Sequence, residues 1–342
     1  MTSFAFDLNN IWFILLGVLL TGYAILDGFD LGVGALHLFA KTDEERRIMM
    51  NSIAPVWDGN EVWLITGGGA MFAAFPDVYA SVFSGFYLAM MLLLVGLIFR
   101  GVSLEFRSKQ TMKWWRKTWD IAFSVSSILI PLLMGVALGN IIIGIPVDQT
   151  KEYVGGFFNL LNPYALLFGL TTVAFFTMHG ALYISMKTEG NLQERTKIWS
   201  RNTSIIFVIF YILTTISTLY IPHMIEPFKK APYLAILILL SMLTIGNISR
   251  TIRLNDYKKA FISSSLSIAI LMGLIGIGIH PNLVISSLDP AFNLTIYNAA
   301  SSQKTLGVML TIALIGMPIV ILYFTFIYRV FRGKVKLDST SY

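Results

Sequence analysis

The sequence predicts an all-α integral membrane protein with nine transmembrane helices, its N-terminus outside the cell and its C-terminus in the cytoplasm. Hydrophobic residues make up 56% of the 342 residues and charged residues only 13%, whereas soluble domains carry about 25% charged residues. The mean hydropathy is +0.71. Lipid must therefore be the solvent for most of the chain, and no polar stretch is long enough to build a soluble domain.

The nine helices follow from the apolar runs. A helix needs about 20 residues to cross the hydrocarbon layer, and the runs that meet this need cover residues 8–27, 53–75, 78–99, 119–141, 162–186, 203–221, 232–249, 261–280 and 305–328. The first helix can extend through Leu31 to Phe39. We interpret residues 1–342 as one transmembrane domain. It comprises helices 1 to 4 in 1–141, helices 5 to 8 in 162–280, helix 9 in 305–328 and a cytoplasmic tail in 329–342.

The orientation follows from the loops between these runs. Of the 25 Lys and Arg residues, 21 fall in alternate loops and the C-terminal tail. The opposite loops hold only four, which are Lys151, Lys229, Lys230 and Lys304. Basic loops stay in the cytoplasm, so the tail is predicted to be cytoplasmic. This count also leaves no basic residue for the interior of a helix.

Three further observations narrow the class of protein. The absence of cysteine excludes disulfides, thiolate metal sites and thioether-linked haem. No basic residue precedes Lys41, so the first apolar run is interpreted as a retained helix and not as a cleaved signal peptide. The net charge of +6 resides in short loops beside the membrane, which argues against a nucleic-acid partner.

Acidic residues inside membrane helices are costly and mark candidate functional sites. Four of them gather at the cytoplasmic ends of the first two helices, and these are Asp27, Asp30, Asp58 and Glu61. The two acids of each pair are spaced three residues apart and share a helix face, so at least one of their carboxyl groups is expected to be protonated in low dielectric. A proton path is one interpretation. The alternative is that the acids cap helix ends or pair with Arg46, Arg47 or Arg100.

The remaining polar residues give weaker signals. Trp57, Asn60 and Arg100 are candidate supports for the acidic group. Asp120 is interpreted as a negative charge near the start of the fourth helix, where it would interact favourably with the positive end of the helix dipole, with a place in a proton relay as the alternative.

The four histidines and the remaining patterns suggest no cofactor site in this chain. No two of His37, His179, His223 and His280 share a depth in the predicted bundle, so we expect no haem bound by this chain alone. His179 is predicted to be a hydrogen-bonded structural residue. No metal-spaced His/Glu pair, phosphate loop or nucleophile elbow is present in the sequence.

Several stretches resemble subunit II of the bacterial cytochrome bd-type quinol oxidases. They include DGFDLGVGAL at 27–36, RRIMMNSIAPVWDGNEVWL at 46–64 and GGGAMFAAFPDVYASVFSGFYLAMMLL at 67–93. The similarity continues in FRGVSLEFRSK at 99–109, LNPYALLFGL at 161–170 and SSQKTL at 301–306. It covers essentially the whole chain and is densest over the first 110 residues.

The resemblance implies a place in a respiratory enzyme of the bacterial cytoplasmic membrane. In this family, subunit I carries the b and d haems and most of the quinol site, and the complex reduces oxygen to water with protons from the cytoplasm. Subunit II supports subunit I and contributes to the proton path. Two four-helix bundles and one peripheral helix are the implied architecture. A third, single-helix subunit and a quinone or lipid bound in this chain stay open.

Two other classes of function are alternatives to this one. A proton- or cation-coupled transporter would also carry membrane carboxylates, but transporters often show inverted repeats and broken helices. A purely structural subunit that binds quinone or lipid is the other alternative. A haem-bearing partner that co-purifies with the chain would separate the oxidase from both.

Overall fold

A computed structural model describes residues 7–337 of the chain, and almost all of its regular structure is helical. The α-helices are α1 (Leu8–Leu36), α2 (Asp43–Ile53), α3 (Trp57–Ala74), α4 (Pro76–Gly85), α5 (Tyr87–Phe106), α6 (Lys113–Ile143), α7 (Pro163–Lys187), α8 (Gly190–Thr218), α9 (Pro222–Lys230), α10 (Ala235–Arg253), α11 (Tyr257–Ile279) and α12 (Gln303–Val330). Five short 3-10 helices join them, at His37–Phe39, Arg107–Lys109, Phe157–Leu160, Pro232–Leu234 and Pro290–Phe292. Two antiparallel strands, β1 (Asn282–Val284) and β2 (Leu294–Thr295), precede α12.

Eight helical segments of the described chain are long and apolar enough to cross a membrane. They are Leu8–Phe39, Tyr87–Lys109, Lys113–Ile143, Pro163–Lys187, Gly190–Thr218, Pro232–Arg253, Tyr257–Ile279 and Gln303–Val330. The predicted run 53–75 is not among them. It corresponds to α3, whose 18 residues begin with a polar turn that contains Asp58, Asn60 and Glu61. The extension of the first helix to Phe39 is confirmed.

Some predicted boundaries are wrong for identifiable reasons. Ile53 ends α2, a separate helix whose Thr42–Glu45 capping box supports its start. The run 78–99 is divided between α4 and α5 at Phe86, which adopts a non-helical backbone conformation. Apolar periodicity alone cannot show such a break, because both sides of it are hydrophobic. The helices predicted to start at 119 and 203 begin at Lys113 and Gly190, since their first turns are polar and continue beyond the apolar run.

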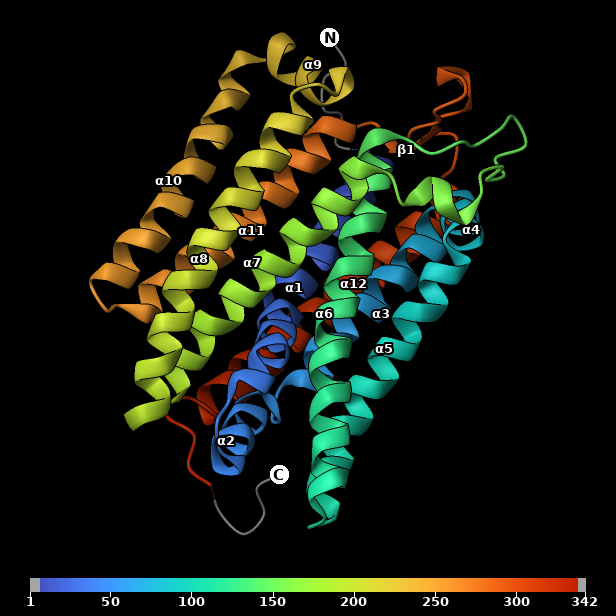
Figure 1. Ribbon diagram of the computed structural model, residues 1–342. Coiled ribbons are helices and arrows are strands. Elements are labelled where there is room, and N and C mark those ends of the chain that lie inside the picture. Colours follow the sequence, from blue (N-terminus) through green and yellow to red (C-terminus); the bar gives the residue numbers. More distant parts are fainter. Residues whose placement is uncertain (1–6, 338–342) are drawn as a thin grey trace.

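The long helices run roughly side by side across the molecule (Figure 1). We call the end that carries α2 the α2 end, and the end that carries α9, α4 and the strands the α9 end. α1 starts at the α9 end and α12 finishes toward the α2 end (Figure 1). α10 lies at the outer edge of the bundle, whereas α1 lies near its middle.

The centre of the bundle is formed where α1 and α7 cross. A Cβ atom on Gly32 would collide with the carbonyl oxygen of Phe176 and the backbone of Gly180, and a Cβ on Gly180 would collide with the backbone of Gly32. Glycine at both positions therefore lets the two backbones touch. In lipid the hydrophobic effect does not drive helices together, so close packing at small residues contributes to their association instead. α1 is thereby fixed at the centre, together with the acids it carries.

Candidate functional site

The central polar feature is a cluster formed by α1, α3 and α5 around Arg100, which we call the Arg100 cluster. Both terminal nitrogens of Arg100 bind the carboxylate of Asp27, at 2.8 and 2.5 Å. The guanidinium also lies 3.8 Å from Asp30 and 3.9 Å from Glu61. Asp27, Asp30 and Arg100 are fully buried. A two-point guanidinium–carboxylate contact is the strongest form of this pair, so Asp27 is the fixed counter-ion of Arg100.

A hydrogen-bonded line connects this cluster to α12. Asn60 donates to Asp30 at 2.7 Å and to the carbonyl of Leu26 at 3.1 Å. The hydroxyl of Tyr328 donates to Asn60 at 2.9 Å. The second oxygen of Asp30 is buried and has no partner among residues 7–337. A buried oxygen in that condition is costly unless a water or a proton satisfies it.

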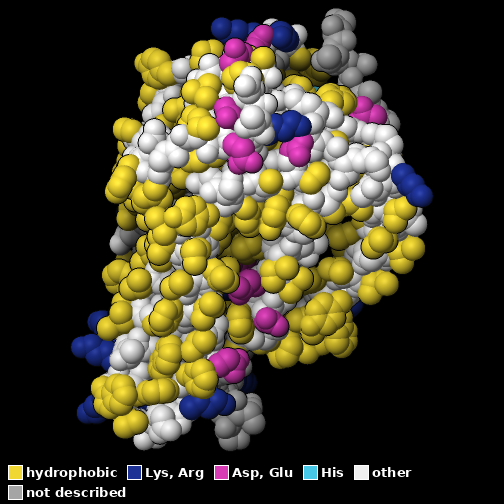
Figure 2. All heavy atoms as spheres, turned by 90° about the vertical axis from the view of Figure 1, so that its right-hand side faces the viewer, with side chains coloured by type: hydrophobic (Ala, Val, Ile, Leu, Met, Phe, Trp, Pro, Cys, Tyr) yellow, Lys and Arg dark blue, Asp and Glu magenta, His cyan; other side chains and the backbone are white. Residues whose placement is uncertain are grey.

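Of the two acids of α3, Asp58 faces the outside of the chain, and Glu61 lies between the Arg100 cluster and the surface. The side chain of Glu61 is 18% exposed, and Asp58, in the first turn of α3, is exposed and has no hydrogen bond or ion pair with the described residues. Figure 2 shows acidic side chains among hydrophobic ones on the right-hand side of Figure 1. A carboxyl group at such a position needs a polar neighbour from outside the chain or must stay near water.

The charge of the Arg100 cluster does not balance if every group is ionised. One guanidinium faces three carboxyl groups. The ring of Trp57 lies 6.0 Å from the guanidinium and contributes no compensating charge. The expectation that no basic residue lies inside a helix is wrong, because Arg100 is buried within α5. The single charge of Arg100 still leaves two of the three carboxyl groups without a cation. The net charge of the cluster is zero only if these two groups are protonated.

A second ionic group, the Asp120 cluster, lies at the α2 end. Asp120 is contacted by Arg107 at 2.5 Å, His37 at 2.6 Å and Arg46 at 2.9 Å. Arg107 is fully buried and also binds Asp43, which pairs in turn with Arg116. The interpretation of Asp120 as a charge at a helix start is wrong, because α6 begins at Lys113 and has no acid in its first turn.

The histidines are engaged within the chain. His179 bonds Ser264 at 2.6 Å and the carbonyl of Ile25 at 3.1 Å, so it is hydrogen-bonded within the chain as predicted. His223 contacts the carbonyl of Ile142, and His280 contacts Asn10. With His37 bound to Asp120, these contacts do not form a facing pair of ring nitrogens suited to a haem. Within residues 7–337, no group of three or more His, Asp or Glu residues could hold a metal ion.

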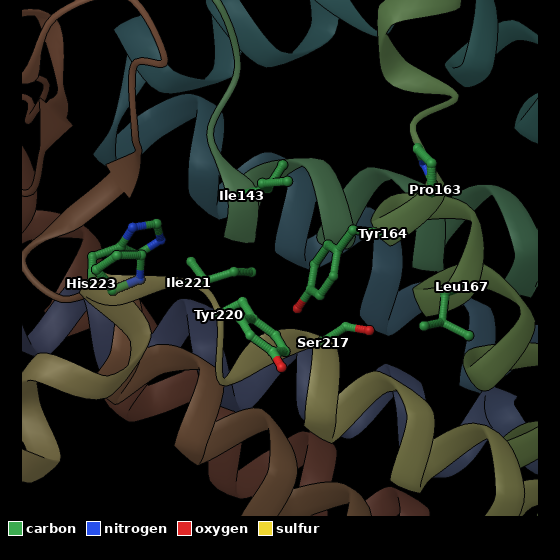
Figure 3. A pocket seen from close by; sticks show the side chains of 9 residues that line it. Ile143, Pro163, Tyr164, Leu167, Ser217, Tyr220, Ile221 and His223 are labelled. Carbon is green, nitrogen blue, oxygen red and sulfur yellow. The ribbon is translucent and has the colours of Figure 1, made fainter.

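A hollow of about 570 Å³ opens toward the α9 end between α7 and α8. Figure 3 shows Tyr164 and Tyr220 in the middle of this hollow, with His223 at one side and Leu167 at the other. Tyr164 is hydrogen-bonded to Thr218 at 2.9 Å. The hollow holds no acidic residue and is separate from both ionic clusters.

The structure thus brings together most of the residues that the sequence singled out. Asp27, Asp30, Glu61, Asn60 and Arg100 meet in one cluster. Asp58 is on the same helix turn as Asn60 and Glu61 but faces outward, and Asp120 belongs to the other cluster. Sequence reasoning missed the role of Tyr328 and the buried arrangement of Arg107 with His37. The only sign that His37 is buried was its position as a polar residue near an apolar run. Nothing in the sequence distinguished Arg107 from the other basic residues of its loop.

These features define a multi-pass membrane protein with two buried ionic clusters of opposite charge balance. The comparisons with known proteins agree on one family. The family model of cytochrome bd terminal oxidase subunit II matches residues 8–331. The chain therefore belongs to the cytochrome bd terminal oxidase subunit II family, and it is a subunit of an oxidoreductase of the respiratory chain.

Individual relatives support this assignment over nearly the full chain. Cytochrome bd-I ubiquinol oxidase subunit 2 of Escherichia coli (strain K12) is 39% identical, with 97% of this chain and 96% of that protein covered. Cytochrome bd ubiquinol oxidase subunit 2 of Bacillus subtilis is 35% identical, with 96% and 97% covered. A chain of the bd oxidase from Geobacillus thermodenitrificans has the same fold. Its TM-score is 0.79 at 19% identity, with 95% of this chain and 98% of that chain covered.

Proposed function

We propose that this chain is the haem-free supporting subunit of a bacterial oxidase that oxidises quinol and reduces oxygen to water with protons from the cytoplasm. The b and d haems and most of the quinol site belong to subunit I, which binds beside this chain in the cytoplasmic membrane. Family membership over residues 8–331 supports the class of enzyme. The single observation that supports a role in proton transfer is the acid excess of the Arg100 cluster.

The path we propose uses Asp58, Glu61 and Asp30, with Asp27 as the fixed partner of Arg100. Asp58 is exposed and Glu61 is partly exposed one turn further along α3. Asp30 is buried and connected to Tyr328 through Asn60. The guanidinium of Arg100 lies within 4 Å of Asp30 and Glu61. Because this positive charge lies close to both carboxyl groups, it favours the ionised form of each, so that one can release its proton transiently while the other stays protonated.

The orientation belongs to the same proposal. We place the α2 end in the cytoplasm and count α3 as a ninth crossing. Two observations support this. α1 starts and α12 ends at opposite ends of the molecule (Figure 1). Most Lys and Arg residues fall in the loops of one side and in the C-terminal tail, and such loops stay in the cytoplasm. Helices 1 to 4 and 5 to 8 of the sequence-based count then form two four-helix groups, and α12 is the peripheral helix. Only 6% of the most apolar window of α12 is buried.

The test replaces Asp58 with Asn in the assembled oxidase. Asn keeps the shape of the side chain but cannot hold and release a proton, so we expect normal assembly and haem content with oxygen reduction lowered about tenfold or more. Asp58→Glu should recover part of the rate. The control is Glu44→Gln, which removes an exposed carboxyl group on α2. Normal turnover and normal membrane-potential generation by the Asp58→Asn enzyme would contradict the proton path and indicate a structural role for Asp58.

A further inference from the structure

A second hollow lies beside α10, at the end of the helix nearer the α2 end. It measures about 350 Å³ and is lined by Gly246, Ser249, Arg250, Arg253 and Leu254. Arg250 and Arg253 are three residues apart, so they lie on one face of the helix. Both are exposed, and neither side chain forms an ion pair or a hydrogen bond with residues 7–337. Two guanidinium groups therefore border a cavity without an anion from the chain.

The surroundings of this hollow are positive. Ser204 of α8 lies 3.5 Å from Ser249, so α8 and α10 meet at this level. Arg201 is one turn from Ser204 toward the α2 end, and it too is exposed and unpaired among the described residues. The acids on the adjoining turns are already paired: Glu194 binds Lys197 at 2.7 Å and Asp256 binds Lys259 at 2.8 Å.

The other side of the hollow is open and apolar. A Cβ atom on Gly246 would have no heavy atom within 4 Å. Leu239, Met242 and Leu243 are 52%, 54% and 58% exposed on the preceding turns of α10. α10 is an outer helix of the bundle (Figure 1), so lipid chains can reach this groove. An apolar groove that ends at two unpaired arginines is complementary to a molecule with an acyl chain and an anionic head.

We propose that this hollow binds the phosphate of an anionic phospholipid from the leaflet at the α2 end. The phosphate accepts hydrogen bonds from the guanidinium groups of Arg250 and Arg253, whose planar donors match phosphate oxygens. The hydroxyl of Ser249 lies at the same site, and an acyl chain passes over Gly246. This inference depends on α10 spanning the membrane and is independent of the proposed proton path.

The test measures how much phosphatidylglycerol the purified, assembled oxidase retains from mixtures with phosphatidylcholine, by native mass spectrometry and by lipid extraction. The variant is Arg250→Gln with Arg253→Gln. The matched control is Arg329→Gln with Arg332→Gln, which removes two exposed arginines at the same spacing near the end of α12. Each basic residue near an anionic lipid surface contributes about fivefold in binding. We expect phosphatidylglycerol affinity to fall about tenfold or more in the variant and by less than about threefold in the control.

Two further measurements distinguish other occupants. Gly246→Leu should weaken phosphatidylglycerol binding by filling the acyl groove, while leaving the arginines intact. Equal retention in the variant, the control and the parent enzyme would overturn the proposal. Displacement of the lipid by millimolar inorganic phosphate would reassign the hollow to a free anion. A crosslink from Arg250→Cys to another chain of the complex would show that a protein covers it.

Discussion

The Arg100 cluster and the Asp120 cluster are both buried ionic groups, but their charges are balanced in opposite ways. In the Arg100 cluster, one guanidinium serves three carboxyl groups. In the Asp120 cluster, the three guanidinium groups of Arg46, Arg107 and Arg116 and the imidazole of His37 serve only two carboxylates, those of Asp43 and Asp120.

This difference is the reason why we propose proton exchange for the Arg100 cluster and a structural role for the Asp120 cluster. A guanidinium stays charged at any accessible pH, so an excess of guanidinium groups keeps Asp120 ionised and fixed. An excess of carboxyl groups can only balance with protons, and the number of protons can change. The Asp120 cluster holds α2, α6 and the end of α5 together. The Arg100 cluster keeps carboxyl groups inside the bundle, next to an exposed surface.

The largest expected effect is on the stability of the Asp120 cluster. Arg107→Gln leaves Asp120 and Asp43 without their shared buried partner. Removal of one member of a buried pair costs about 3–5 kcal/mol, so we expect a large loss of assembled complex and a lower unfolding midpoint. Arg116→Gln is the matched comparison. Its pair with Asp43 is partly exposed, and exposed pairs contribute less than about 1 kcal/mol. Equal stability of the two variants would contradict the structural role that we assign to this cluster.

The second prediction compares the loss of one carboxylate from each cluster. Asp30→Asn keeps an acceptor for Asn60 and leaves Asp27 on Arg100, so we expect the complex to assemble normally and its oxygen-reduction rate to fall about tenfold or more. Asp120→Asn should do the reverse, because it leaves Arg107 and Arg46 short of negative charge. The assay compares haem content, unfolding midpoint and oxygen consumption of both enzymes. If Asp30→Asn unfolds the complex and Asp120→Asn only slows it, the assignment of the two clusters is wrong.

Much of this organisation could be predicted from the sequence, since lipid demands long apolar helices and leaves a strong composition signal. The four acids at the ends of the first helices were found because a carboxyl group in a membrane run is costly wherever it points. The choice of partner could not be predicted. Asp27 binds Arg100, which is 73 residues away, and Arg46 binds Asp120, which is 74 away. Only the packing of α5 and α6 on α1 and α2 decides between such partners.

The exposure of Asp58 was also beyond the sequence. Its spacing from Glu61 predicts a shared face, but Asp58 is exposed whereas Glu61 is largely covered and lies 3.9 Å from Arg100. The same spacing cannot say whether that side faces the bundle or its exterior. The answer depends on Asn60, which takes the inward position and binds Asp30. Asn60 therefore contacts the buried acid, Asp58 points to the surface, and Glu61 lies between the two, 3.9 Å from Arg100.

The smallest expected effect is a pH dependence that extends the comparison outside the membrane. Glu45, in the first turn of α2, accepts hydrogen bonds from the backbone of Lys41 and Thr42 and pairs with Arg195 at 3.0 Å. Partial burial acts to raise the pKa of Glu45, but these hydrogen bonds and the guanidinium outweigh it and lower the pKa below its usual range. The charged form is therefore favoured by folding. Its contribution should be fully present above the unfolded pKa of about 4.3 and be lost as the pH falls through the lower folded value.

A carboxylate held in this way at the α2 end should thus titrate only in acid. Glu45→Gln is expected to lower the unfolding midpoint of the complex slightly at pH 7, because α2 loses the charged half of its capping box and its link to α8. The difference from the parent enzyme should shrink below pH 4 and vanish once Glu45 is protonated in the folded state. Glu44→Gln, an exposed change in the same turn, controls for the charge on α2. A midpoint difference that stays constant down to pH 3 would mean that the neutral side chain binds α2 as well as the carboxylate does.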